Sequence, residues 1–173
     1  GDLMRSFEKM TDSIRDKAAA AQQIAVGNLA VEIEARSAND VLANSMKQVV
    51  ESLRALVAEA GMLTNASVDG KLDTRGNAEN FKGGYKDIVK GINETLDAVI
   101  GPLNVAAEYI DRIAKGDIPP KITDSYRGDF NEIKNNLNMC IDAIGALVTD
   151  ANTLVKAAVD GKLDVRADAT KHQ

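Results

Sequence analysis

Four glycines are the residues whose type and spacing first suggest chemistry, because glycine-rich loops can hold phosphate groups. They are Gly27, Gly70, Gly116 and Gly161. None belongs to a Gly-x-Gly-x-x-Gly or Walker pattern after a strand, whereas glycine is the usual residue just past the end of a helix. We therefore interpret all four as helix-terminating residues.

The single cysteine, Cys140, and the single histidine, His172, are the other candidates for reactive groups. One Cys and one His cannot complete a usual zinc shell, and one Cys cannot form an intrachain disulfide. Cys140 directly precedes the apolar Ile141, which favours an inert, partly buried side chain over a redox sensor. His172 has no second ligand or acid nearby in the sequence, so we expect a solvated side chain.

The remaining polar residues form no catalytic set, because no Ser stands with a base and no carboxylate pair lies in an apolar setting. We therefore expect no enzyme activity, no metal, no cofactor and no small-molecule ligand. The formal net charge of -5 argues against non-specific nucleic-acid binding, which requires a basic surface. No apolar run is long enough to span a membrane, and Gly1–Arg5 does not begin a signal peptide.

An internal repeat is organised around the glycines. The segment Val68–Arg75 (VDGKLDTR) recurs as Val159–Arg166 (VDGKLDVR), and the four glycines lie about 45 residues apart. A fixed period of roughly 20 to 50 residues indicates an array of one supersecondary unit. A unit this small rarely holds a core alone, so we expect the chain to associate.

Helices must position these glycines, because apolar residues recur at steps of three and four on either side of them. Residues 1–26 predict one helix. Later helices are expected from about Asp40 to Asp69 and from about Asp129 to Asp160, and non-helical connectors of about 13 residues follow the glycines. The apolar seam of the second helices comprises Leu42, Val49, Leu53, Tyr85, Ile88, Ile92, Leu96, Phe130, Ile133, Leu137 and Ile141.

Gly101-Pro102 lies within the apolar seam between the second and third glycines. Proline lacks the backbone donor and pushes its predecessor away from the α region. We therefore predict a helix break or kink at Pro102, with Pro102 as the first residue of the next helix.

The order of helix, glycine, connector and second helix resembles a HAMP domain. Gly128–Asn138 (GDFNEIKNNLN), together with Val68–Arg75, is similar to the poly-HAMP segments of bacterial methyl-accepting chemotaxis proteins. On this resemblance, residues 18–57, 58–100 and 102–146 are three HAMP units. Residues 1–17 are then the second helix of a preceding unit, and residues 147–173 are the first helix and partial connector of a further one.

The resemblance implies an all-α fold of tandem HAMP units, in which parallel homodimeric four-helix coiled-coil bundles stack into a rod and adjacent units share long helices. Each connector would return along the outside of its unit; about 13 extended residues at roughly 3.3 Å span about 43 Å, enough for this crossing. The residues expected to hold the connectors are Gly27, Leu29, Gly70, Leu72, Gly116, Ile118, Gly161 and Leu163.

Two features depart from the family pattern. Family members usually carry a Glu after an Asp at the start of the second helix, where this chain has Asp40-Val41, Gly84-Tyr85 and Asp129-Phe130. A second aliphatic connector residue is available as Ile33 and Ile122, but Phe81 is the only bulky candidate in the middle connector. We therefore expect the middle connector to pack loosely.

The function implied by the resemblance is an intracellular signal relay in a chemoreceptor. The chain would pair with itself as a parallel homodimer. It would pass conformational change from an upstream transmembrane sensor to a downstream signalling domain of the same chain. It would lie in the cytoplasmic portion of a protein anchored in the inner membrane. Small or polar seam residues such as Ala18 and Ser45 favour two helix packings of similar free energy.

Three alternatives remain open at this point. The segment could belong to a poly-HAMP sensor histidine kinase, it could be a passive coiled-coil spacer, or it could be a ligand-binding helical sensor. A spacer does not require recurring Gly-x-Leu connectors, and a sensor requires a pocket with convergent polar groups.

Overall fold

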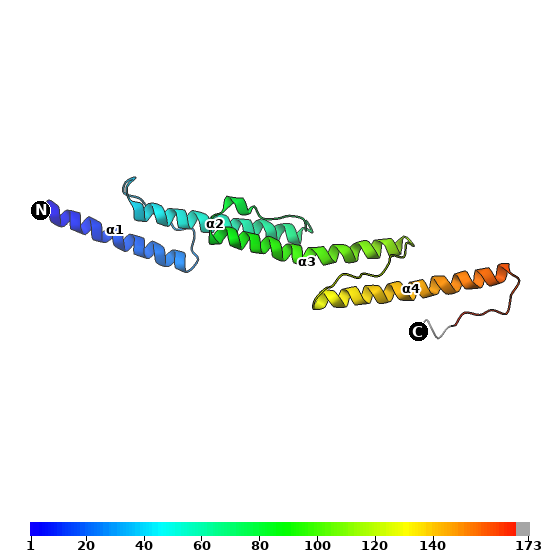
Figure 1. Cartoon of the computed structure of the whole chain (residues 1–173). Coiled ribbons are helices and arrows are strands. Elements are labelled where there is room, and N and C mark those ends of the chain that lie inside the picture. Colours follow the sequence, from blue (N-terminus) through cyan, green and yellow to red (C-terminus); the bar gives the residue numbers. More distant parts are fainter. Residues whose placement is uncertain (169–173) are drawn as a thin grey trace. The chain divides into compact units, whose positions relative to one another are not determined.

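The computed structural model describes residues 1–168 and consists of helices joined by extended connectors (Figure 1). The helices are α1 (Asp2–Ala25), α2 (Val41–Val68), the short 3-10 helix η1 (Ala78–Asn80), α3 (Gly84–Ala114) and α4 (Asp129–Val159). No strand occurs within the described range, so the expected all-α class is confirmed. The chain divides into two compact units, residues 1–96 and the residues from 97 onward.

The connectors follow the helices in turn: the first (residues 26–40) joins α1 to α2, the second (residues 69–83) joins α2 to α3, and the third (residues 115–128) joins α3 to α4. A fourth connector begins at residue 160. The predicted connector positions are therefore confirmed. The second connector differs in containing η1, which the sequence pattern did not predict.

All four predicted glycines terminate a helix in the same way. Their φ angles are positive, at +84°, +74°, +80° and +73° for Gly27, Gly70, Gly116 and Gly161. In each turn the N–H of the residue after the glycine donates to a carbonyl five residues earlier, as in a Schellman motif. These bonds are Asn28 to Gln23 (2.9 Å), Lys71 to Ala66 (2.8 Å), Asp117 to Arg112 (3.0 Å) and Lys162 to Ala157 (2.8 Å). The helix-terminating interpretation is confirmed.

The first connector runs back along α1, so that α1 and α2 lie side by side and point the same way (Figure 1). At its end, the Arg36 guanidinium donates to the Lys9 carbonyl in the first half of α1. At its start, Arg54 Nε, four turns into α2, donates to the Leu29 carbonyl at 2.6 Å. The long crossing connection predicted for two parallel helices is therefore present in the first connector.

The core of this first segment is small and apolar. It consists of Ala20, Ile33, Ala43 and Val50, with Ile24, Val31, Ala35 and Met46 packed against it. The buried α2 residues lie one position after the predicted seam residues Leu42 and Val49. The chain's own core therefore uses the face of α2 beside the seam.

The predicted helix break at Pro102 is wrong, because α3 continues through it from Gly84 to Ala114. Two physical reasons explain the continuity. The residue before it, Gly101, has no Cβ to collide with the proline ring, which weakens the usual restriction on that position. Pro102 is also half-buried beside Val105 and Ile122, so apolar packing offsets the missing hydrogen bond.

Candidate functional site

The connectors and the helix faces beside them form the candidate functional site. Of the four Gly-x-Leu/Ile residues, Leu29 and Ile118 are half-buried, whereas Leu72 and Leu163 are 41% and 74% exposed. The deeply buried connector side chains lie further along, at Ile33, Phe81, Pro119 and Ile122. The role of the Gly-x-Leu/Ile residues in holding the connectors stays a prediction.

The second connector packs tightly, which corrects the expectation of loose packing. Phe81 is 7% exposed, and Val89 beneath the connector is completely buried. Gly76 sits so close to α3 that an added Cβ would lie 2.8 Å from Val89 Cγ1. The Asn77 N–H also donates to Glu59 Oε1 at 2.6 Å. Phe81 and the close approach of Gly76 to α3 thus take the place of the second aliphatic residue found in the other connectors.

Two asparagines that sequence reasoning missed bind the second and third connectors. Asn93 accepts from the Gly76 N–H at 2.8 Å and donates to the Gly76 carbonyl at 2.9 Å. Asn138 does the same with Ile122, at 2.8 Å and 3.0 Å. A signal was available, because each asparagine lies eight residues after an aromatic seam residue, Tyr85 or Phe130.

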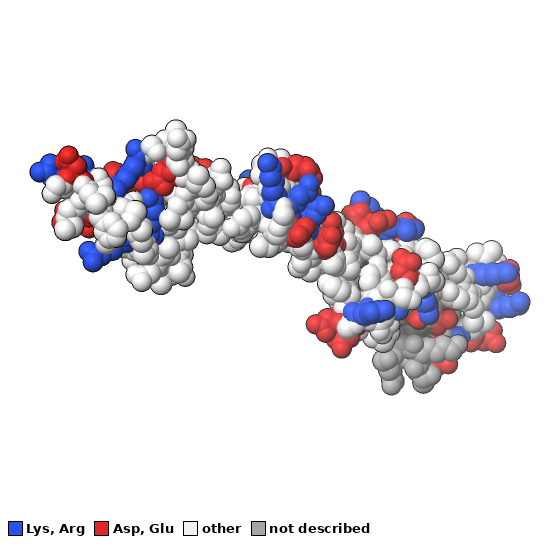
Figure 2. Space-filling model, turned by 60° about the vertical axis from the view of Figure 1, so that its left-hand side comes forward, with Lys and Arg blue, Asp and Glu red and all other residues white. Residues whose placement is uncertain are grey.

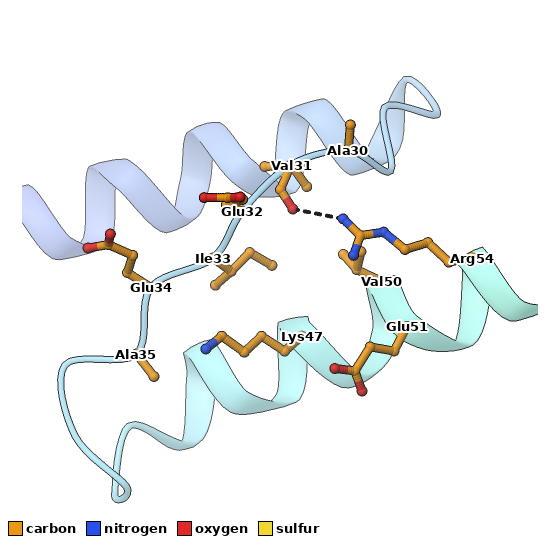
Figure 3. A pocket seen from close by; sticks show the side chains of 10 residues that line it. All are labelled: Ala30, Val31, Glu32, Ile33, Glu34, Ala35, Lys47, Val50, Glu51 and Arg54. Atoms are coloured by element: carbon orange, nitrogen blue, oxygen red, sulfur yellow. Dashed lines mark hydrogen bonds between the residues drawn. The ribbon is translucent and has the colours of Figure 1, made fainter.

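The first connector is held differently (Figure 3). Arg54 reaches across from α2 and donates to the Leu29 and Val31 carbonyls, at 2.6 Å and 3.3 Å. Ile33 points from the connector toward α2, near Val50. Beside it runs an open groove of about 580 Å³, bordered by the charged side chains of Glu32, Glu34, Lys47, Glu51 and Arg54.

An ion pair joins α1 to the start of α2. Lys17 Nζ lies 2.9 Å from Asp40 Oδ2, and both side chains are largely shielded, at 12% and 13% exposure. Asp40 also caps α2 by accepting from the Ala43 N–H at 3.2 Å. The hydrogen bond from Lys17, followed by that from Ala43, lowers the pKa of the Asp40 carboxyl. Lys17 thus connects α1 to the residue that begins α2.

The predicted seam is largely uncovered in the single chain. Leu42, Val49, Ile88 and Ile133 are 55%, 43%, 49% and 36% exposed, and Leu53, Tyr85, Ile92, Leu96, Phe130 and Leu137 are half-buried. Of the predicted seam residues, Ile141 alone is buried, at 6% exposure. An apolar surface that recurs along successive helices is typical of a protein–protein interface.

Charged side chains of both signs are interspersed with uncharged surface on the face seen in Figure 2. Several exposed pairs connect neighbouring residues, such as Lys115 with Asp111 at 2.6 Å. Lys121 of the third connector pairs with Asp142 of α4 at 2.6 Å, with both side chains about half exposed. Exposed ion pairs contribute little to stability, so packing and the amide hydrogen bonds hold the third connector in place.

Of the reactive candidates, Cys140 lies within the described residues and makes none of the contacts above. Cys140 is exposed, which corrects the expectation of partial burial, because Ile141 takes the inward position and the preceding residue lies about 100° away around the helix. His172 lies outside the described residues. Residues 1–168 contain no group of three potential metal ligands and no helix long and apolar enough to cross a bilayer.

The module formed by α1, the first connector and α2 is a parallel helix pair with a returning connector. Residues 80–146 match the HAMP domain family. The matched segment includes α3, the third connector and the first half of α4, and it contains the Asn138 contact with Ile122 and the apolar cluster around Pro102. HAMP domains are signal-relay modules of chemoreceptors and histidine kinases. The resemblance inferred from the repeat is confirmed for this segment.

Proposed function

We propose that the chain is a tandem array of HAMP units that forms a parallel homodimer and relays conformational change along its helices. The repeat units would be residues 18–57, 58–100 and 102–146, with partial units at residues 1–17 and 147–173. The input would come from an upstream, membrane-anchored sensor, and the output would be a downstream chemotaxis signalling domain of the same protein, on the cytoplasmic side.

The observation that carries this proposal is the uncovered apolar seam. Val49, Ile88 and Ile133 lie on successive helices and remain 36% to 49% exposed, although their neighbours Val50 and Val89 are buried against the chain's own connectors. One face of α2 and of α3 is therefore buried by the chain's own connectors, whereas the apolar seam face stays exposed and requires a partner. A second copy supplies an identical face, which is the usual solution for soluble oligomers.

Continuous helices favour a relay, in which the units are coupled, rather than a set of independent modules. In the proposed array, α2, α3 and α4 each serve as the second helix of one repeat unit and the first helix of the next. Because α3 runs unbroken through Pro102, rotation or displacement of its first half would be passed to its second half.

The dimer is tested by sedimentation equilibrium and by cysteine crosslinking in a Cys140→Ser background. Val49→Cys, Ile88→Cys and Ile133→Cys should each crosslink with the same residue of a second copy. Matched controls two residues later on the same helices, Glu51→Cys, Lys90→Cys and Asn135→Cys, should crosslink poorly because they lie on the opposite side. A monomer at high concentration, or equal crosslinking of both sets, would refute the parallel dimer.

The relay is separated from a passive spacer by connector variants in the complete protein. A relay should change its output when Phe81 or Ile122 is replaced by Ala. A spacer should keep its output in both variants, provided that the helices still form. Circular dichroism of the same variants checks helix content. Output that tracks only helix content would favour the spacer.

The sensor histidine kinase is distinguished from the chemoreceptor by the output of the complete protein. Autophosphorylation of the same chain would favour the histidine kinase, and control of a separate kinase would favour the chemoreceptor.

A further inference from the structure

The three complete connectors present the same position to the second helix, yet the contact there differs. Six residues after the terminating glycines stand Ile33, Gly76 and Ile122. Gly76 and Ile122 meet Asn93 and Asn138, whereas Ile33 meets Val50. The same structural position therefore carries a polar contact twice and an apolar contact once.

The asparagine contact fixes one point of the connector. A side-chain amide offers one donor and one acceptor, and here both pair with the N–H and the carbonyl of a single residue. Sliding the connector by one residue would break both hydrogen bonds and would turn the next side chain away from the helix. Both asparagines are half-buried, so a broken pair would leave polar groups poorly hydrated.

The first connector has no equivalent constraint. Val50 is 3% exposed and has no group that can pair with a peptide. In the described part of the chain, no hydrogen bond involves the N–H or carbonyl of Ile33. The groove of about 580 Å³ (Figure 3) and a second groove of about 340 Å³ both border Ile33, so the connector is not enclosed there.

The contacts that do hold the first connector lie at its ends. Arg54 binds the Leu29 and Val31 carbonyls near the start, and Asp40 accepts from the Arg36 N–H at 3.3 Å near the end. Between them, residues 32–35 are held by the side chain of Ile33 and the partly buried Ala35. Apolar contacts are not directional, so they permit sliding and separation where the paired amide does not.

We propose that Asn93 and Asn138 are connector clamps that fix the second and third connectors on α3 and α4, and that the first connector, which faces Val50, separates from α2 far more readily. The two classes of connector make the repeat units mechanically unequal. The first connector is the segment that opens, and the clamped ones keep their position. This inference concerns the connectors of the chain itself and holds whether or not the chain is a signal relay.

Residue-resolved amide hydrogen exchange on the intact 173-residue chain tests the proposal, because exchange measures local opening. In the unmodified chain, the Ile33 N–H should exchange at least about tenfold faster than those of Gly76 and Ile122, after correction for intrinsic rates. Asn93→Ala and Asn138→Val should accelerate exchange at Gly76 and at Ile122 by about tenfold, respectively. Asn104→Ala and Asn136→Ala, exposed on the same helices, should change neither.

Val50→Asn should create a clamp on the first connector, because it places an asparagine opposite Ile33. In this variant the Ile33 N–H should exchange about tenfold more slowly. The third connector shows that a buried isoleucine and an asparagine fit together at these positions. Amides of α2 report whether the variant folds; if it does not, the loss-of-clamp variants decide. Equal protection of Ile33, Gly76 and Ile122 in the unmodified chain would overturn the proposal, and so would unchanged exchange in both loss-of-clamp variants.

Discussion

Lys17 Nζ on α1 lies 2.9 Å from Asp40 Oδ2 at the N-cap of α2, and each side chain is nearly nine-tenths shielded from solvent. The same carboxylate accepts from the backbone N–H groups of Ala43 and Arg36. One residue therefore ends the first connector, begins α2 and binds α2 to α1.

The first prediction concerns acid sensitivity. The bond from Lys17 lowers the folded-state pKa of Asp40, so the contribution of Asp40 to stability is present above about pH 4, the ordinary aspartate range, and is lost as the pH falls through the lowered value. Lys17→Met should raise the Asp40 pKa and lower the melting temperature at neutral pH. The melting temperature of this variant should also fall less steeply as the pH is lowered. NMR titration of the carboxyl and thermal melts at several pH values measure these effects.

A matched control for this prediction is Lys71→Met. Its partner Asp69 lies at 3.1 Å, but both side chains are more than half exposed. Exposed pairs contribute little, so the melting temperature should hardly change. An unchanged Asp40 titration in Lys17→Met would show that the backbone bonds alone account for the lowered pKa.

The second prediction concerns Gly76. An added methyl group would lie 2.8 Å from Val89 Cγ1 and 3.2 Å from Glu59 Oε1, and Val89 is fully buried and cannot move aside. Gly76→Ala should therefore lower the free energy of unfolding by about 1–3 kcal/mol in urea denaturation. Gly91→Ala, in open space on α3, should raise it by roughly 0.5–1 kcal/mol.

The steric origin of this effect can be isolated with Val89→Ala. The combined Gly76→Ala and Val89→Ala variant should lose less stability than the sum of the two single losses, because the shorter side chain makes room for the new methyl group. If the two losses of unfolding free energy simply add, the destabilisation by Gly76→Ala does not come from its contact with Val89.

The third prediction concerns Pro102. Proline inside a helix is about 3 kcal/mol less favourable than alanine, and part of this difference is recovered here by packing. Pro102→Ala should raise the free energy of unfolding by roughly 1–2 kcal/mol without changing helix content. Pro119→Ala provides the contrast, because Pro119 is fully buried in the third connector and its loss should destabilise. Destabilisation by Pro102→Ala would mean that its packing outweighs the backbone cost.

The fourth prediction compares two residues of the second connector. Phe81 is 7% exposed and Leu72 is 41% exposed. Phe81→Ala should cost about 3 kcal/mol of unfolding free energy, and Leu72→Ala about 1 kcal/mol or less. Urea denaturation of both variants at one protein concentration measures the difference. A larger loss for Leu72→Ala would show that a second copy of the chain buries Leu72.

Local patterns were sufficient to predict α1, α2, α4 and the connectors that follow the glycines, but not the continuity of α3 or the short helix η1. Steps of three and four apolar residues define helix faces, and Gly27, Gly70, Gly116 and Gly161 end helices through their own backbone freedom, so neighbouring residues carry the information. The same patterns identified Phe81 as the only bulky candidate for the second apolar position of the second connector, but they predicted loose packing there, whereas Phe81 is buried.

Contacts between distant residues decided the rest, because they depend on how the connector lies against the helix. Asn93 and Asn138 share their spacing from Tyr85 and Phe130, but that spacing does not indicate that they bind Gly76 and Ile122. Pro102 reads as a break from its own chemistry alone, whereas the apolar groups packed around it keep α3 continuous. Packing is set by three-dimensional proximity, which a spacing pattern along the chain does not contain.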